Sequence, residues 1–138
     1  MARKKYHDYL RRVPLFADLD NSELEAVGRA ATDLDLKAGS VLMRQGDLAH
    51  EMVVVVEGTL EVTRGGEFVA DIGPGGFAGE MALLIHAPRN STVTAKTDVA
   101  LLHIDGRVFK SLLDNVPHIA VKMLPVVAKR AVAMPPDD

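Results

Sequence analysis

Short segments that alternate apolar and polar residues fill the middle of the chain, from residue 33 to residue 104, and they restrict the fold more than any other feature. Near the start of this region, apolar residues alternate with polar neighbours, as in strands with one buried face. These apolar residues are Leu34, Leu36, Val41 and Met43. Residues 52–56 form a run that is too short and too β-branched to favour a helix. Turns separate the segments at Lys37–Ser40, Gln45–Asp47, Glu57–Gly58 and Arg64–Gly66. About eight short strands joined by such turns predict a barrel or a sandwich in which each strand buries one face.

The first part of the chain predicts helices. Residues 3–12 carry apolar residues at helical spacing, which suits a short helix. Asp20 is expected to cap a second helix over residues 21–31, because its carboxylate can accept a hydrogen bond from the Glu23 amide while the Glu23 side chain reaches back.

The last third of the chain is also predicted to be helical. Residues 105–113 are amphipathic, and a final helix is expected to begin at Pro117 because proline suits the first helical position. Pro125 falls inside this final helix, so a kink or break near Leu124 is expected. The chain is therefore predicted to be one α+β domain over residues 1–138, with helices in 1–31, a β-barrel in 33–104 and helices in 105–134.

The size and composition exclude several classes of protein. With 138 residues, 48% of them hydrophobic, the chain can bury the core of a single domain. The formal net charge is -3 and both signs are spread along the chain, so direct binding of nucleic acid is not expected. The chain has no cysteine, which excludes disulfides, thiolate metal sites and thiol catalysis. No apolar run reaches the roughly 18 residues of a membrane span, so a soluble, cytoplasmic protein without membrane contact is expected.

A glycine-rich stretch from Gly73 to Ala95 interrupts the strand pattern, which resumes at residues 91–95 and 99–104. The glycines that precede Glu80 are Gly73, Gly75, Gly76 and Gly79. Small residues let backbone N–H groups approach an anion closely, and a helical turn beginning near Glu80 would direct further N–H groups toward it. The stretch therefore predicts a site for a negatively charged ligand.

Glu80 and Arg89 narrow the chemistry of that ligand. A carboxylate beside an anion is unfavourable unless it accepts hydrogen bonds from hydroxyl groups, such as a ribose 2′-OH. Arg89 follows Pro88, and its planar guanidinium suits phosphate oxygens better than a lysine would. A ligand with a ribose beside a phosphate would satisfy both residues. The alternative is that Glu80 and Arg89 form an internal ion pair that closes a loop.

Residues 77–83 and 88–95 resemble the phosphate-binding cassette of cyclic nucleotide-binding domains, which would span residues 77–95. Such domains occur in protein kinase A regulatory subunits, catabolite activator proteins and cyclic nucleotide-gated channels. The resemblance includes the Gln45–Asp47 turn and the helix start at Asn115–Pro117, and it covers roughly residues 10–131. It implies a β-barrel of the jelly-roll type, flanked by N-terminal and C-terminal helices.

The resemblance also implies which residues bind the ligand. Glu80 would accept from the ribose 2′-OH, Arg89 would pair with the cyclic phosphate, and nearby amides would complete the phosphate shell. The expected ligand-binding residues are Phe77, Ala78, Gly79, Glu80, Met81, Ala82, Arg89, Asn90, Ser91 and Arg130. Asn90 departs from the family, in which a hydroxyl side chain at this position can favour guanine. Arg130 and Met134 would belong to a lid over the base.

The expected function is that of a sensor and not of an enzyme, with no catalytic residue and no metal site. cAMP is the preferred ligand and cGMP the alternative, and binding would move the C-terminal helices. The chain ends soon after the last helix, so the signal would pass to an effector protein, to a second copy in a homodimer, or to the rest of a longer protein. The rival interpretations are a phosphodiesterase, for which no His/Asp metal cluster is recognisable, and an apo protein-interaction module that no longer binds nucleotide.

Overall fold

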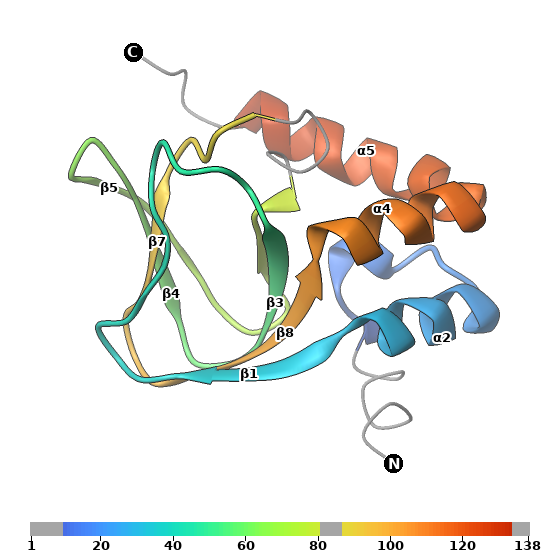
Figure 1. Ribbon diagram of the computed structural model, residues 1–138, viewed down its shortest axis with the longest axis horizontal. Coiled ribbons are helices and arrows are strands. Elements are labelled where there is room, and N and C mark those ends of the chain that lie inside the picture. Colours follow the sequence, from blue (N-terminus) through green and yellow to red (C-terminus); the bar gives the residue numbers. More distant parts are fainter. Residues whose placement is uncertain (1–9, 81–86, 134–138) are drawn as a thin grey trace. The chain divides into compact units, whose positions relative to one another are not determined.

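The computed structural model describes residues 10–80 and 87–133. The chain divides into two compact units, a β unit over residues 32–106 and a helical unit formed by the segments before and after it (Figure 1). The presence of a β unit and a helical unit confirms the predicted α+β class. The expectation that residues 1–138 form a single domain stays a prediction. The helix predicted for residues 3–12 lies mostly outside the described residues, and Met134 lies outside them as well.

Two antiparallel four-stranded sheets make up the β unit, and they confirm the predicted jelly-roll barrel of eight strands (Figure 1). The first sheet has the order β1 (Thr32–Leu36), β8 (Val99–Asp105), β3 (Glu51–Glu57) and β6 (Phe77–Ala78). The second has the order β2 (Val41–Met43), β7 (Thr92–Ala95), β4 (Leu60–Arg64) and β5 (Glu67–Ile72). The sequence pattern predicts all of these strands except β6, which lies within the glycine-rich stretch.

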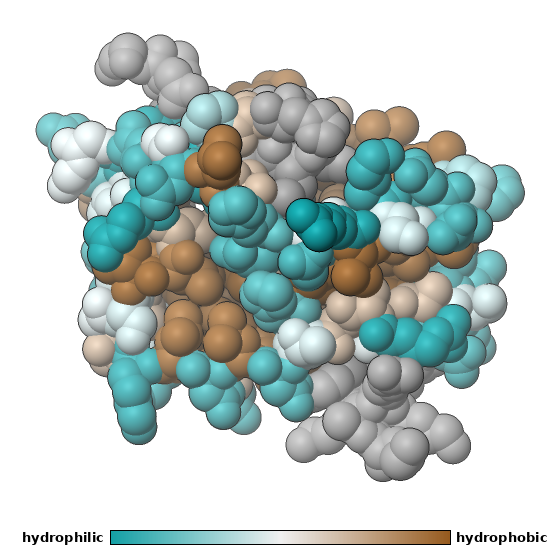
Figure 2. Space-filling view, viewed as in Figure 1, coloured by the Kyte–Doolittle hydropathy of each residue, from teal (hydrophilic) through white to brown (hydrophobic). Residues whose placement is uncertain are grey.

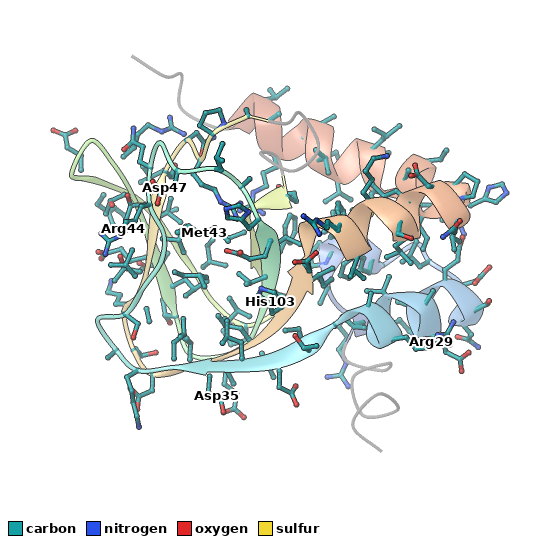
Figure 3. All side chains as sticks on the ribbon, in the orientation of Figure 1. Arg29, Asp35, Met43, Arg44, Asp47 and His103 are labelled. Atoms are coloured by element: carbon teal, nitrogen blue, oxygen red, sulfur yellow. The ribbon has the colours of Figure 1, made fainter. Side chains whose placement is uncertain are left out.

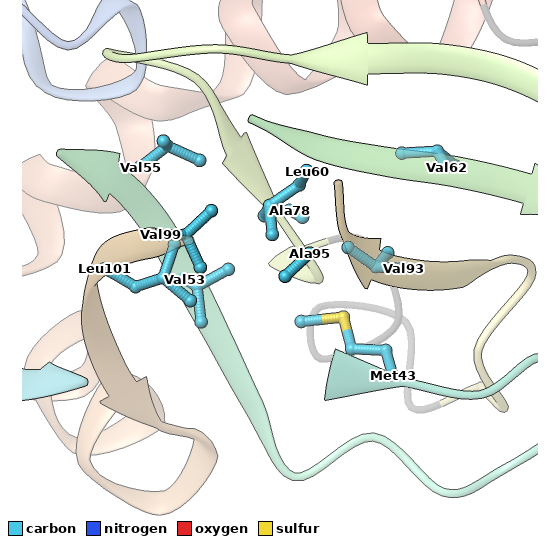
Figure 4. Close-up of a cluster of buried hydrophobic side chains, with 10 residues drawn as sticks. All are labelled: Met43, Val53, Val55, Leu60, Val62, Ala78, Val93, Ala95, Val99 and Leu101. Carbon is cyan, nitrogen blue, oxygen red and sulfur yellow. The ribbon is translucent and has the colours of Figure 1, made fainter. Parts of the chain in front are cut away.

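Apolar side chains from both sheets meet in a core inside the barrel (Figure 4). This core consists of Met43, Val53, Val55, Leu60, Val62, Ala78, Val93, Ala95, Val99 and Leu101. Residues 52–55 of β3 are all buried, so this strand is covered on both faces. Burial of both faces explains why β3 reads as an unbroken apolar run and not as an alternating one.

Some apolar side chains of the β unit reach the surface, among them Val41, which is 39% exposed. The prediction that Val41 shares a buried face with Met43 is therefore wrong. The register of β2 against β7 shifts between these two residues, so the two-residue period fails there. On the face seen in Figure 2, apolar side chains gather over the barrel and polar side chains surround them.

The β4–β5 hairpin confirms the turn predicted at Arg64–Gly66. Arg64 pairs with Glu67, so Gly65 and Gly66 are the two loop residues, with φ of 60° and 83°. Positive φ at both positions is the geometry of a type I′ turn, which glycine adopts without steric cost.

The helical unit contains a short 3-10 helix, η1 (Pro14–Phe16), and the helices α2 (Asn21–Ala30), α4 (Gly106–Asn115) and α5 (Pro117–Ala133). The predicted capping box is present at the start of α2. The Glu23 amide donates to Asp20 Oδ1 at 2.8 Å, and the Asp20 amide donates to Glu23 Oε1 at 2.8 Å. Two backbone N–H groups that the helix leaves unbonded are thereby satisfied.

Helix α5 continues through Pro125 to Ala133. Of the kink or break expected near Leu124, the break is therefore wrong and the kink stays a prediction. Proline has no N–H to donate to the carbonyl four residues earlier, which here belongs to Val121. Val121 is 63% exposed and Pro125 is exposed as well, so water can reach that carbonyl. Solvation on this side of the helix makes the missing hydrogen bond tolerable.

A partly buried ion pair links α2 to α5. Glu23 is 6% exposed, and Lys122 Nζ lies 2.6 Å from its Oε1. This hydrogen bond holds the pKa of Glu23 below its ordinary value and raises the pKa of Lys122. The same carboxylate thus caps one helix and holds the other.

In the described parts of the chain, none of the helices combines the length and the apolar character needed to cross a membrane.

Candidate ligand-binding site

Strand β6 brings the start of the cassette to the edge of the first sheet. Phe77 and Ala78 pair with Val54 and Val53 of β3, and both β6 residues are buried. Gly79 follows with a φ of 93°, a left-handed conformation that side chains other than glycine rarely adopt. This turn carries the chain from the sheet edge to Glu80, which is 1% exposed.

Gly79 lies where a side chain has no room. An added Cβ atom would lie 2.7 Å from Arg89 Nη1, 2.7 Å from the Met43 methyl carbon and 2.8 Å from the Glu51 carbonyl oxygen. These distances are shorter than real Cβ contacts. Glycine is therefore required here for its conformation and for the close approach of Arg89.

The guanidinium of Arg89 is held inside the β unit by hydrogen bonds. Its Nη1 donates to the Gly79 carbonyl at 3.0 Å, and its Nη2 donates to the Glu51 carbonyl at 2.6 Å. Nη2 also lies 3.3 Å from Glu51 Oε1, which makes an ion pair. The residue is only 6% exposed. The Arg89 side chain thus connects β3 with the cassette, two segments that are far apart in sequence.

Burial and neighbouring charges shift the pKa of Arg89 in opposite directions. Desolvation lowers the pKa of the guanidinium, while the negative charges of Glu51 and Glu80 raise it. Arginine has so high an ordinary pKa that it stays protonated in proteins. Arg89 is therefore a buried cation, and the predicted partner Glu80 contributes to its electrostatic stabilisation.

The Gln45–Asp47 turn fixes the backbone on both sides of Arg89. The Gly46 amide donates to the Arg89 carbonyl at 2.9 Å, and the Arg89 amide donates to the Asp47 carbonyl at 2.8 Å. The Gln45 amide donates to Thr92 Oγ1 at 3.0 Å. This turn, which the sequence pattern predicts as a strand connection, is thus also part of the scaffold of the site.

The two residues after Arg89 are hydrogen-bonded within the same unit. Ser91 is 5% exposed, and its hydroxyl lies 3.0 Å from Asn90 Oδ1, to which it can donate. Arg64 Nε donates to the Asn90 carbonyl at 3.1 Å. The amide side chain at position 90 is therefore engaged by its own neighbour.

A cavity of about 430 Å³ opens beside Arg89. It is lined by Val41, Leu42, Met43, Arg44, Asp47, Leu48, His50, Glu51 and Arg89. Met43, Arg44 and Asp47 come from β2 and the turn that follows it (Figure 3). The cavity brings further basic side chains, Arg44 and His50, to the same wall as the guanidinium.

The structure brings Gly79, Glu80 and Arg89 together, as the sequence predicts. Met81, Ala82 and the helical turn expected after Glu80 lie at residues 81–86, outside the described residues. Arg130 lies on α5 in the helical unit, so its assignment to a lid stays a prediction. The ligand-binding roles of all these residues are taken up as proposals below.

Glu51 was missed by sequence reasoning. It stands at the first position of β3, and nothing in its local pattern distinguishes it from the other carboxylates that begin or end strands. The only usable signal would have been the register that brings the start of β3 next to the cassette. Within residues 10–80 and 87–133, no group of three or more His, Asp or Glu side chains is close enough to hold a metal ion.

Chemically, the arrangement offers a charged donor and a charged acceptor to a ligand. A buried guanidinium offers charged N–H donors to an anion. A buried carboxylate nearby can accept hydrogen bonds from hydroxyl groups.

Comparison with known proteins gives concordant results. The family model described as "Cyclic nucleotide-binding domain" matches residues 34–116. A cAMP-dependent protein kinase regulatory subunit of Schizosaccharomyces pombe is 33% identical over 114 residues, which are 82% of this chain and 28% of that protein. A cyclic nucleotide-gated potassium channel of Mesorhizobium japonicum is 39% identical over 108 residues, which are 78% of this chain and 30% of that protein.

Solved structures include the regulatory subunit of a cAMP-independent protein kinase A from Trypanosoma brucei, with a TM-score of 0.82 and 25% identity. That match covers 96% of this chain and 46% of the other chain. The present chain therefore spans less than a third of the curated relatives that it matches and about half of this structure. The family model covers more than half of the chain, and the fold agrees with it. The chain belongs to the cyclic nucleotide-binding domain family.

Proposed function

We propose that this chain is a regulatory module that binds cAMP in preference to cGMP. In this proposal Arg89 pairs with the cyclic phosphate and Glu80 accepts from the ribose 2′-hydroxyl. The observation that carries it is the buried guanidinium of Arg89, held beside the 1% exposed carboxylate of Glu80 at the matching cassette positions. The similarity to a cAMP-dependent kinase regulatory subunit supports the choice of ligand.

The preference for adenine is supported by position 90. A serine or threonine hydroxyl there can favour guanine, according to the resemblance to the family. Here the side chain is Asn90, and its Oδ1 lies within hydrogen-bond distance of the Ser91 hydroxyl. Asn90 has no hydroxyl group, so the contact that can favour guanine in the family is absent, and we expect cAMP to bind more tightly.

The proposed output is a movement of the C-terminal helices α4 and α5, which would act on an effector protein, on a second copy of the chain or on a linked domain. A ligand can shift such an equilibrium only by the difference between its affinities for the two arrangements. This output needs binding and no turnover, so the module is proposed not to be an enzyme. Incubation with cAMP should leave the nucleotide intact, with no AMP formed.

Calorimetric titration with cAMP and with cGMP tests the proposed function. The wild-type chain is expected to bind both, with the lower dissociation constant for cAMP. If it binds neither nucleotide at high micromolar concentration, it is not a sensor of either. A lower dissociation constant for cGMP would overturn only the base preference.

One observation favours the alternative of an apo interaction module. Arg89 donates to two carbonyl groups and to Glu51, so groups of the chain itself accept hydrogen bonds from its guanidinium. The solved relative described as cAMP-independent is consistent with this alternative. The calorimetric titration separates the two functions, since an apo module would give no heat of binding.

The Glu80→Ala variant is expected to bind cAMP about tenfold more weakly than wild type, because a hydrogen bond to a charged group contributes roughly 1.5–3 kcal/mol. Binding of 2′-deoxy-cAMP should not weaken, since that ligand has no hydroxyl for Glu80 to accept from. Titration of both ligands measures the difference. Equal losses for both would contradict the assigned role, and the Glu80→Gln variant, which keeps the side-chain volume, checks that the loss does not come from unfolding.

A further inference from the structure

The positive charge of Arg89 is already shared with two carboxylates of this chain. Glu51 forms an ion pair with Nη2 at 3.3 Å, and both Glu51 and Glu80 stabilise the charged guanidinium. An incoming phosphate must therefore bind next to two groups of its own sign. Of the two, Glu80 has a proposed function in ribose binding, whereas Glu51 has none.

The Glu51 carboxylate is not what holds Arg89 in place. The shorter hydrogen bonds of the guanidinium go to backbone carbonyl groups, those of Gly79 at 3.0 Å and of Glu51 itself at 2.6 Å. The carboxylate contact is longer, at 3.3 Å, and the Glu51 side chain is 20% exposed. Because the two backbone contacts remain when the carboxylate leaves, Arg89 can keep its position without it.

The structure also leaves space for the carboxylate to move. Glu51 and Arg89 both line the cavity of about 430 Å³. Arg44 and His50 line the same cavity, so a displaced carboxylate would remain among groups that can donate hydrogen bonds to it. A change of side-chain rotamer is thus enough to uncover Nη2, with no change in the backbone of β3.

We propose that Glu51 is an internal competitor for the phosphate, whose carboxylate occupies Arg89 in the ligand-free chain and is displaced when a cyclic nucleotide binds. This rests on the proposed function, since it assigns Arg89 to the phosphate. Glu51 then sets the affinity of the site: it weakens binding of an anion without touching the base or the ribose. It also prevents the buried cation from attracting other anions when no nucleotide is present.

Glu51→Gln removes the competing charge and keeps the shape of the side chain. We expect this variant to bind cAMP roughly 1.5- to fivefold more tightly than wild type, the range that a partly exposed ion pair provides. Glu57→Gln is the matched control, because it changes the same charge at the other, exposed end of the same strand. Its affinity for cAMP should equal that of wild type. Calorimetric titration of the three proteins measures the effect.

Adenosine, which carries no phosphate, tests whether the effect depends on ligand charge. Its weak binding, followed by ligand-observed NMR, should be the same for wild type and for Glu51→Gln. If adenosine gains as much as cAMP, the variant acts through shape and the competitor role is wrong.

Other outcomes are equally decisive. Unchanged or weaker binding of cAMP by Glu51→Gln would show that the carboxylate positions Arg89, which overturns the inference while leaving the proposed function intact. An equal gain in affinity for Glu57→Gln would show that the effect comes from the net charge of the chain. That result would also overturn the inference. If none of the three proteins binds cAMP, the proposed function fails and the inference fails with it. Glu51→Ala, expected to gain affinity in the same way, replaces the glutamine variant if that protein does not fold.

Discussion

Replacing Arg89 by alanine is expected to weaken cAMP binding at least about 30-fold, the lower end of the cost of truncating one member of a buried, hydrogen-bonded charge pair. The guanidinium is 6% exposed and is fixed by two backbone carbonyl groups, so its charged donors are held in place for the phosphate before binding. Calorimetric titration measures the loss. Arg89→Lys keeps the charge without the planar fork and should fall between alanine and wild type.

The same substitution should also destabilise the fold. It leaves the buried carboxylate of Glu80 and the partly buried one of Glu51 without the cation that they stabilise, and removal of one partner from a buried pair costs about 3–5 kcal/mol. Arg29→Ala is the control with the same change of charge, since the Arg29 side chain is 57% exposed and its pair with Glu25 is long, at 4.0 Å. Urea unfolding should show almost no change for that control. If Arg89→Ala is folded and binds cAMP as tightly as wild type, the phosphate site has been assigned to the wrong residue.

Gly79→Ala is expected to lower the free energy of unfolding by about 2–5 kcal/mol, which combines the cost of a left-handed alanine with that of overpacking. The added methyl group would lie 2.7 Å from Arg89 Nη1 and 2.8 Å from the Glu51 carbonyl oxygen. Arg89 must then move away from both of its backbone partners. We therefore also expect cAMP to bind at least about tenfold more weakly, which corresponds to the loss of one charge-assisted hydrogen bond.

The Gly39→Ala variant separates the cost of a left-handed backbone from the cost of crowding by neighbouring atoms. Gly39 has a φ of 90°, close to the 93° of Gly79, but no atom lies within 4 Å of its added Cβ. This variant should lose only about 1–2 kcal/mol of stability and keep its affinity for cAMP. Similar losses of stability in the two variants would show that Arg89 is not crowded by position 79.

Most of the barrel could be predicted because its strands carry their own signals. Alternation, β-branched runs and glycine turns identified seven of the eight strands before any contact was known. Strand β6 has two residues, too few to show a period, and both of them are buried by their pairing with β3. The burial expected for Val41 and the break expected at Pro125 failed for a related reason. A register shift and the solvent exposure of one helix face cannot be predicted from the local sequence.

The site residues of the cassette could be predicted from the sequence. The residues that contact Arg89 from β3 and from the Gln45–Asp47 turn could not. Gly79, Glu80 and Arg89 are close in sequence, so their spacing alone suggested a common ligand. Glu51 meets Arg89 across 38 positions, and the Gly46 amide bonds to the Arg89 carbonyl from a different turn. Those contacts depend on how β2 and β3 are registered in the two sheets. Electrostatic competition at the guanidinium is therefore visible only in the folded chain.

The first and last strands of the barrel, β1 and β8, pair with each other, so the barrel begins and ends with neighbouring strands. β1 directly follows α2, β8 leads directly into α4, and Thr32 pairs with His103. Paired residues in antiparallel strands have Cα atoms about 5 Å apart, so the segment leaves and rejoins the rest of the chain at nearly the same point. Segments whose two ends coincide in this way can be transplanted into a surface loop of another protein without stretching either chain. Residues 32–106 thus define the piece to graft when the proposed phosphate site is to be placed in an unrelated host without the helices α4 and α5.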